Sequence, residues 1–592
     1  MLRILTKYIF VALGYIRRPA CRQAGCHMPH TIEDIINKII SADPTTKDEF
    51  DRARRKFSNE IKFQQPSNRM LLKTYQKMVK NGSVEHDKQF ETFMRKADIR
   101  SMSGIAVITS LVKPYMCPGT CVYCPTEYRM PKSYIASEPA AARSLRLNFD
   151  PYLLMQKRIE MLETHGHPCD KIEYIIKGGT WNAYPLKYQY WYILESFRAC
   201  NDLTKEKYAN LPAGRQGRQI SKRLTEDDLD NLKLKQLQQL LDEEQTYNET
   251  ADHRIIGLTL ETRPDAIMPK TINHMRRMGC TRIELGLQST DNKILDLIQR
   301  GHTVQQFRDA ITLLRQAGFK VDLHFMPDLP GSSPEHDIEM YQELFTDPAL
   351  KPDMVKIYPC AVIKSAELYQ WLEDGRYVPY GEEGLFRALL EMKSSTPRYC
   401  RISRLIRDIP SDEIEAGNKI TNLREALEKE LHKRGEKCIC LRCREIGRQL
   451  KHVADDVVPQ IFVDEYETIG GTEYFITLED PDRIAVYGFL RLRIPDKTFE
   501  GNPKIFEYLP EIKDAAFIRE LHTYGQLVGI GKTVDGASQH TGLGKQLVAK
   551  AEDIAKENEY VKMAVISGVG VKGYYRKLGY ENERTYVTKE LA

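Results

Sequence analysis

The sequence predicts an α/β protein in which a partial TIM-like β/α barrel is followed by a separate α+β domain. Two observations predict this fold. Strand-like and helix-like patterns alternate from about residue 103 to residue 395, as in a parallel sheet with helices on its outer face. From residue 458 to residue 592 the pattern changes to short strands and one long helix. We therefore expect two folded halves joined by residues 396–457.

Composition supports a globular chain. Of the 592 residues, 42% are hydrophobic and 29% are charged, and 87 Lys+Arg against 82 Asp+Glu give a net charge of +5. This balance is not that of a disordered or fibrous protein. No run of about 18 apolar residues occurs, so we expect no membrane helix. Of the 13 cysteines, six fall in two tight clusters, and we see no secretory leader, which together predict a cytoplasmic protein with metal chemistry.

The N-terminal part divides into an extension and a basic helical region. We expect residues 1–27 to be unstructured. Residues 28–102 carry apolar side chains at helical spacing. Within 51–100 there are 13 Lys/Arg and 6 Asp/Glu, an excess of 13 − 6 = +7. A basic arm of this kind contacts phosphates, although a solvated helix surface would look the same in the sequence.

The barrel region contains six strand candidates. They fall at 105–109, 172–176, 255–260, 282–287, 321–325 and 354–358, with helical patterns between them. Residues 200–252 interrupt the alternation with a polar stretch, which we expect to be an exposed helical insertion without a catalytic role.

Three cysteines follow the first strand candidate. Cys117, Cys121 and Cys124 have the spacing C-x3-C-x2-C in a loop that also holds glycine and proline. Three thiolates on one loop can hold three irons of a cubane cluster and leave the fourth iron open to a chelating cosubstrate. A structural zinc loop is the alternative, but zinc normally requires four protein ligands, and no fourth Cys or His lies close by.

Polar residues also stand at the ends of later strand candidates. Ligands of parallel α/β barrels bind at the carboxyl ends of the strands. Glycines there let the backbone approach a ligand closely. The residues at these ends are Gly178, Gly179, Thr180, Glu261, Arg263, Gln288, His324 and Lys356.

A second cysteine cluster lies in the 396–457 linker. Cys438, Cys440 and Cys443 supply three thiolates, and one further ligand would complete a tetrahedral, structural zinc site. Cys360 is our candidate for that ligand because it would tie the linker to the barrel, and His432 is the second choice. Three reduced thiols without metal remain the alternative.

The C-terminal half contains an anion-binding pattern. Gln539, Gly542 and Gly544 form a Q-x-x-G-x-G loop that opens the long helix. Backbone N–H groups at a helix N-terminus favour an anion such as a pyrophosphate. Tyr575 follows in the segment 573–580.

Each half resembles a known family. The cysteine spacing and the Gly-Gly pair at 178–179 resemble the radical S-adenosylmethionine superfamily, although Thr180 stands where that family has Glu. The glycine loop, the long helix and the segment 573–580 resemble the GNAT acetyltransferases. The combination resembles the catalytic-subunit family of Elongator in its single-chain form, the tRNA uridine(34) acetyltransferases, over about residues 30–592.

The resemblance implies a tRNA-modifying enzyme with a 4Fe-4S cluster, S-adenosylmethionine and acetyl-CoA. A 5′-deoxyadenosyl radical would take hydrogen from the acetyl methyl group, and the resulting carbon radical would add to carbon 5 of the wobble uracil. Thioester hydrolysis would then leave carboxymethyluridine. The partners would be the anticodon region of tRNA, bound through residues 28–102, and an electron donor.

The resemblance also assigns site residues. Cys117, Cys121 and Cys124 would hold the cluster. Gly178, Gly179, Thr180, Gln288 and Lys356 would bind S-adenosylmethionine. Lys171 and Tyr575 would be catalytic, and the acetyl-CoA contacts would be Lys171, Glu520, Leu521, His522, Thr523, Leu543, Gly544, Lys545 and Tyr575.

Two other functions fit parts of the sequence. One is a protein lysine acetyltransferase in which the cluster is structural, but this leaves the open cluster site without a purpose. The other is a catalytically silent tRNA-binding scaffold, against which the intact cysteine triplet argues. The oligomeric state is left open.

Overall fold

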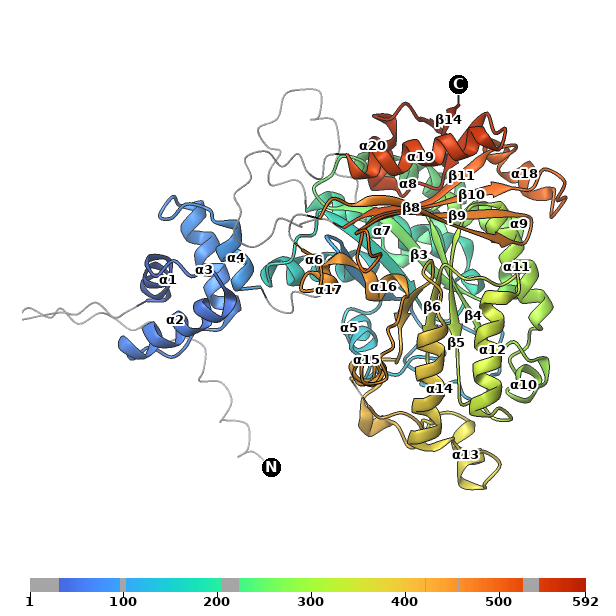
Figure 1. The fold of residues 1–592 in the computed structure, drawn as a ribbon, viewed down its shortest axis with the longest axis horizontal. Coiled ribbons are helices and arrows are strands. Elements are labelled where there is room, and N and C mark those ends of the chain that lie inside the picture. The colour runs from blue at the N-terminus through green and yellow to red at the C-terminus, as the bar shows by residue number, and fades with distance from the viewer. Residues whose placement is uncertain are drawn as a thin grey trace, which may run out of the picture. The chain divides into compact units, whose positions relative to one another are not determined.

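The computed structural model describes residues 31–95, 103–203, 223–420, 422–454, 457–524 and 542–591 (Figure 1). The chain divides into two compact units, Met1–Met94 and Arg95–Ala592. The expected extension 1–27 lies outside the described residues.

The first unit is helical, as predicted. Its helices are α1 (Ile32–Ser41), α2 (Lys47–Glu60), α3 (Asn68–Lys80) and α4 (Lys88–Phe93). Thr31 and Thr46 start α1 and α2 with capping boxes, which satisfy backbone N–H groups that a helix start leaves free. The isoleucines of α1 pack against Phe50, Leu72 and Tyr75 in a small core. Many of the basic residues of α2 and α3 point to solvent, including Arg52, Arg55, Lys56, Arg69, Lys73, Lys77 and Lys80.

The second unit begins with a seven-stranded parallel sheet in the order β1-β2-β3-β4-β5-β6-β7. Among the described residues β1 and β7 do not pair, so the sheet is a half-barrel, which confirms the predicted fold class. The last strand was not predicted. The strands are β1 (Ala106–Leu111), β2 (Lys171–Lys177), β3 (Arg254–Thr262), β4 (Arg282–Gln288), β5 (Lys320–Phe325), β6 (Met354–Ile357) and β7 (Arg401–Arg404).

Helices cover the outer face of this sheet. They are α5 (Pro139–Arg146), α6 (Pro151–Thr164), α7 (Leu186–Asp202), α8 (Leu234–Asn248), α9 (Pro269–Arg277), α10 (Asn292–Leu297), α11 (Val304–Gln316), α12 (Pro334–Thr346), α13 (Leu368–Glu373) and α14 (Gly381–Ser395).

Helix α8 differs from the exposed insertion that we expected at 200–252. Leu237 and Leu241 of α8 are fully buried. Its buried Glu244 accepts a hydrogen bond from Asn201 Nδ2 at 2.7 Å. The polar residues that suggested an exposed segment are therefore partly internal, and α8 belongs to the crossover between β2 and β3.

The linker and the C-terminal half complete the unit. The linker holds α15 (Leu423–Lys433), α16 (Leu441–Arg444) and α17 (Ile446–Gln449). A second seven-stranded sheet follows, in the order β13-β14-β12-β11-β10-β9-β8. Its elements are β8 (Gln460–Thr468), β9 (Gly471–Glu479), β10 (Val486–Pro495), α18 (Lys504–Tyr508), β11 (Ala516–Thr523), α19 (Leu543–Glu557), β12 (Lys562–Val565), α20 (Lys572–Arg576), β13 (Glu581–Glu583) and β14 (Tyr586–Glu590).

The second sheet packs against the N-terminal ends of the barrel strands, where Figure 1 shows the orange and red elements. Gly568 lies against the backbone of β3, and a Cβ there would fall 1.9 Å from the Ile256 carbonyl oxygen. The Phe517 ring covers Gly318, just before β5. The close fit between the two halves joins their apolar side chains in one core.

Candidate active site

One cavity of about 1010 Å³ is lined by both halves of the second unit. At one end lie the three cysteines of the loop after β1. At the other end lie residues at the N-terminal ends of the barrel strands and residues of β11 from the second sheet. The barrel lumen therefore connects the predicted cluster loop to the predicted acetyl-CoA strand.

The cysteine loop is fixed by its backbone. The Val122 N–H donates to the Ile298 carbonyl at 3.1 Å, and the Val122 carbonyl accepts from the Leu368 N–H at 2.8 Å. The Gly119 N–H donates to Cys117 Sγ at 3.4 Å. Burial and the neighbouring Cys121 raise the pKa of Cys124 to about 11, so a metal would have to displace its proton.

The donor set of this loop fits an iron–sulfur cluster. All three thiols border the same cavity, and they are the softest ligands that a protein offers. A buried arginine, Arg300, donates from Nη1 to Cys121 Sγ at 3.6 Å. Sequence reasoning gave no signal for Arg300.

A buried charged group stands at the carboxyl ends of the strands. Glu284 pairs with the ammonium of Lys177 and, at 2.5 Å, with Lys356 Nζ. His324 Nε2 lies 3.5 Å from the same carboxylate. Burial and the ammonium of Lys356 lower the pKa of His324 well below its usual value, so the ring is neutral at pH 7. Lys177 and Glu284 were not predicted, although both lie at strand positions facing the lumen.

The two glycines after β2 form a second part of this end. Gly178 has φ +151° and Gly179 has φ +82°, values that favour glycine. Their N–H groups donate to Glu261 Oε2 at 3.2 and 3.5 Å. Although burial opposes it, Lys177 lowers the pKa of Glu261 to about 2, which keeps this acceptor ionised.

Most residues predicted for S-adenosylmethionine lie together around the cavity. Thr180 Oγ1 is 3.9 Å from Cys117 Sγ. Gln288 is held at φ +77° where β4 ends. Gly179, Thr180, Gln288 and Lys356 all line the cavity.

The opposite end of the lumen is lined by ion pairs. Lys320 of β5 pairs with Glu520 of β11 at 3.0 Å, which joins the two halves directly. Arg282 of β4 pairs with Glu173 of β2 at 2.5 Å, over the intervening strand β3. Glu520, Leu521 and His522 border the cavity, as predicted acetyl-CoA contacts should, whereas Thr523 is not among the lining residues.

Strands β11 and β12 separate in a way that suits an extended ligand. They are parallel and pair only from Ala516 to Ile518, but β11 continues to Thr523. Among the described residues, the edge of β11 towards β12 therefore has no ladder partner after Ile518, while the other edge pairs with β10 as far as Thr523. Helix α19, which carries the predicted Leu543, Gly544 and Lys545, begins close by, because a Cβ on Gly544 would lie 3.7 Å from Thr523 Cγ2. Gln539 to Thr541 of the predicted loop fall outside the described residues.

Two predicted catalytic residues lie away from the cavity wall. Lys171 begins β2 with an exposed side chain and does not line the cavity. Tyr575 is 5% exposed and packs in the core of the second sheet. Its neighbour Tyr574 reaches the first turn of α19, since a Cβ on Gly544 would meet the Tyr574 hydroxyl at 2.6 Å.

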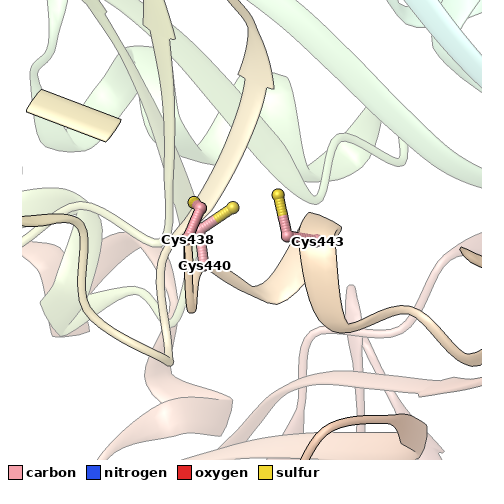
Figure 2. Close-up of side chains that lie close together, drawn as sticks. All are labelled: Cys438, Cys440 and Cys443. Atoms are coloured by element: carbon pink, nitrogen blue, oxygen red, sulfur yellow. The ribbon is translucent and has the colours of Figure 1, made fainter. Parts of the chain in front are cut away.

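The second cysteine cluster is assembled. The thiols of Cys438, Cys440 and Cys443 lie within 4.8 Å of one another, from the segment before α16 and from α16 itself (Figure 2). Lys393 of α14 is fully buried, and its Nζ lies 3.3 Å from Cys443 Sγ. This set has the softness that zinc prefers.

Cys360 does not join these three thiols. Its buried side chain lies in the cavity wall beside Tyr377 and Asp328. His432, the second choice, is exposed at the end of α15. A carboxylate also lies beside this cluster, because Glu428 Oε1 is 3.7 Å from Cys443 Sγ.

Comparison with known proteins first defines the class of the barrel. Residues 224–344 match the model of the Radical SAM superfamily, and residues 352–433 match the Radical_SAM C-terminal domain. The half-barrel with its three-cysteine loop is thus of the radical S-adenosylmethionine class.

Relatives along the whole chain narrow this class. The tRNA uridine(34) acetyltransferase of Methanocaldococcus infernus is 40% identical over 87% of this chain and 91% of its own length. Elongator complex protein 3 of Homo sapiens is 33% identical over 95% of this chain and 97% of its own. The solved archaeal Methanocaldococcus infernus Elp3 with an N-terminal deletion superposes with a TM-score of 0.66 at 38% identity, covering 83% of this chain and 100% of that one.

The chain therefore belongs to the family of the tRNA uridine(34) acetyltransferases and Elongator complex protein 3. This confirms the resemblance predicted from the cysteine and glycine motifs. In the part of the chain that the structure describes, no helix combines the length and apolar character needed to cross a bilayer.

Proposed function

We propose that this protein modifies the wobble uridine 34 of tRNA, using acetyl-CoA and S-adenosylmethionine to place a carboxymethyl group on carbon 5 of the base. The observation that carries the proposal is the single cavity of about 1010 Å³ between the cysteine loop and β11. Two halves that acted on separate substrates would have no need of a shared interior. Family membership supports action on uridine 34 of tRNA, because the Methanocaldococcus infernus relative is a tRNA uridine(34) acetyltransferase.

The cluster and its cosubstrate would occupy the carboxyl ends of the strands. Cys117, Cys121 and Cys124 would hold a 4Fe-4S cluster, and S-adenosylmethionine would lie against Gly178, Gly179, Thr180, Gln288 and Lys356. When bound, these groups supply the radical chemistry that an unactivated methyl C–H bond requires. An electron donor is then needed as a partner.

Residues of the chain shape the site around that chemistry. The pair of Glu284 with Lys356 keeps a buried charge compensated at the lumen wall. The neutral His324 beside it has one ring nitrogen that can accept a proton, and accepting it would leave a cationic ring next to the Glu284 carboxylate.

Acetyl-CoA would enter from the second sheet. The edge of β11 that faces β12 has no ladder partner after Ile518 among the described residues, and its N–H and C=O groups would bind the amides of the pantetheine arm. The N-terminus of α19, at Leu543, Gly544 and Lys545, favours the pyrophosphate. The thioester would then point along Glu520 and His522 into the lumen. Lys171 and Tyr575 do not line the cavity, so they would contact acetyl-CoA only outside it.

The N-terminal helical unit would bind tRNA. Its exposed lysines and arginines on α2 and α3 can contact phosphates around the anticodon. The target base would have to leave its stack to reach a buried cavity.

Zinc would brace the linker between the halves. Cys438, Cys440 and Cys443 would supply three thiolates, and the Glu428 carboxylate, which lies 3.7 Å from Cys443 Sγ, would be the candidate fourth ligand in place of Cys360. The buried Lys393 ammonium would offset the excess negative charge of three thiolates on one divalent ion.

The test is anaerobic incubation of the reconstituted full chain with tRNA, acetyl-CoA and S-adenosylmethionine, followed by nucleoside mass analysis. We expect carboxymethyluridine, and none when the three loop cysteines are replaced by alanine. Acetylated lysines in a protein substrate without need of S-adenosylmethionine would favour a lysine acetyltransferase. Binding of tRNA without any product would favour a silent scaffold.

A further inference from the structure

A buried arginine behind the cysteine loop lacks a carboxylate partner. Arg300 follows α10 and is 8% exposed. Its Nη2 donates to the Gly286 carbonyl at 2.6 Å, and its Nη1 lies 3.6 Å from Cys121 Sγ. Among the described residues no carboxylate oxygen lies within 4.0 Å of this guanidinium, although other buried arginines of the chain have one.

A second arginine touches the same loop but is already neutralised. Arg263 Nε donates to Asp265 Oδ1 at 2.9 Å. Its Nη1 and Nη2 donate to the carbonyls of Arg300 and Gly301 at 3.1 and 3.2 Å. Arg263 therefore braces the segment that carries Arg300, while its own charge is compensated elsewhere.

Glycines make room for both guanidinium groups. A Cβ on Gly286 would fall 2.4 Å from Arg300 Nη2. A Cβ on Gly119, inside the cysteine loop, would fall 2.5 Å from Arg263 Nη1. The two glycines therefore let the Arg263 guanidinium rest on the cysteine loop and the Arg300 guanidinium reach Cys121.

Burying a cation without an anion is costly, so Arg300 needs a negative partner. Two kinds of group near the guanidinium can carry negative charge, the Tyr123 phenol and the cysteine sulfurs. Burial raises the pKa of Tyr123 well above its usual value, so the phenol stays neutral and the Cys121 sulfur, 3.6 Å from Nη1, is the partner. We propose that Arg300 is a positioning residue that donates to the Cys121 thiolate and raises the reduction potential of the cluster held by this loop. This inference rests on the proposed function, since it requires that cluster.

The direction follows from charge. Reduction adds one electron to a group already bound by three thiolates, and a nearby N–H of a cation stabilises the more negative state. Hydrogen bonds to cluster sulfurs are among the levers that set such potentials. We expect loss of Arg300 to change the ratio of reduced to oxidised cluster about tenfold at a fixed potential, which is about 59 mV for one electron.

The experiment is a redox titration of the full chain, reconstituted with iron and sulfide and followed by the paramagnetic signal of the reduced cluster, without S-adenosylmethionine. Arg300→Met removes both charge and donor, and Arg300→Lys keeps the charge. Arg263→Lys is the matched control, because it disturbs the loop brace without contacting a sulfur. We expect a lower potential in Arg300→Met, a smaller shift in Arg300→Lys and none in Arg263→Lys.

Equal potentials for the parent and Arg300→Met, both with full iron content, would overturn the inference. Equal shifts in Arg263→Lys and Arg300→Met would also overturn it, because the effect would then be one of loop packing. If Arg300→Met fails to retain iron, Arg300→Gln and Arg300→Lys decide: a lower potential in the Gln variant supports the role of the charge, and identical potentials refute it. A parent protein that takes up no iron would refute the proposed function instead.

Discussion

Asp353 is a buried carboxylate at the junction between the two halves. It lies just before β6, is fully buried and accepts hydrogen bonds from Arg519 Nη1 of β11 and from the Val321 N–H, both at 2.9 Å. Arg491 Nη1 of β10 lies 3.7 Å away. We predict that Asp353→Ala destabilises the second unit strongly, because the buried guanidinium groups of Arg519 and Arg491 would lose this carboxylate as a partner.

The magnitude follows from what remains. Breaking one partner of a buried ion pair costs about 3–5 kcal/mol. In the variant Arg519 would keep Glu473 at 3.2 Å, and Arg491 would keep Glu520 at 2.9 Å. The loss should therefore lie near the lower end, at about 3 kcal/mol. The lumen should suffer as well, since Glu520 borders the cavity from the same strand as Arg519.

The assay is urea unfolding of the full chain, followed by intrinsic fluorescence and by circular dichroism. The double variant Asp353→Ala/Arg519→Met removes one of the stranded charges, so it should regain part of the loss. Asp374→Ala is the control, because its partner Arg376 and Asp374 itself are both half exposed, and we expect no measurable change. A loss below about 1 kcal/mol for Asp353→Ala would refute the claim that this carboxylate secures the junction.

Three further variants test the cavity, its charge and the linker. Gly257 lines the lumen, and an added Cβ there would have no atom closer than 3.8 Å, so a leucine side chain fits and would obstruct the lumen. Gly257→Leu should therefore keep acetyl-CoA binding and S-adenosylmethionine cleavage but reduce tRNA product at least about tenfold. The pKa of Glu261 is lowered to about 2 in the folded state, so its ionised carboxylate stabilises the fold by about 3 kcal/mol above pH 4.5. This stabilisation is lost as the pH falls towards about 2, and Glu261→Gln should remove it. Lys393→Met should weaken zinc retention about 10–100-fold in a chelator competition.

Each of these variants has a control and an outcome against it. Gly257→Ala adds only a methyl group and should stay active; full activity of the Leu variant would mean that nothing passes this part of the lumen. The parent and Glu261→Gln should converge in stability in acid, and a constant difference from pH 7 to pH 3 would argue against an ionised Glu261. Unchanged zinc affinity in Lys393→Met would assign that lysine to packing alone.

Much of the fold could be predicted, but the charged interior could not. Alternation of strands and helices was enough to place six strands of the half-barrel. Strand β7, Arg401–Arg404, escaped because its sequence R-I-S-R has one apolar residue and its neighbours supply the burial. Helix α8 escaped because Leu237 and Leu241 are few among polar residues, some of which are buried in hydrogen bonds.

The same limit applies to the site. The cysteine spacings predicted both thiol groups because each lies within one short segment. Cys360 lies apart from the three linker thiols, and Lys171 lies outside the cavity lining. The sequence indicates that a residue is near a strand end, but not in which direction its side chain points. Arg300 and Glu284 act through partners more than 70 residues away in the chain, which no local pattern reveals.

The central claim is that both halves act on one acetyl-CoA inside one cavity. The most direct measurement supplies acetyl-CoA whose methyl group is fully deuterated and determines the deuterium content of the modified wobble uridine by mass spectrometry. Bond formation at the methyl carbon predicts a carboxymethyl group that carries two of the three deuterons. An unchanged acetyl group with all three, or a product with none, would contradict the account.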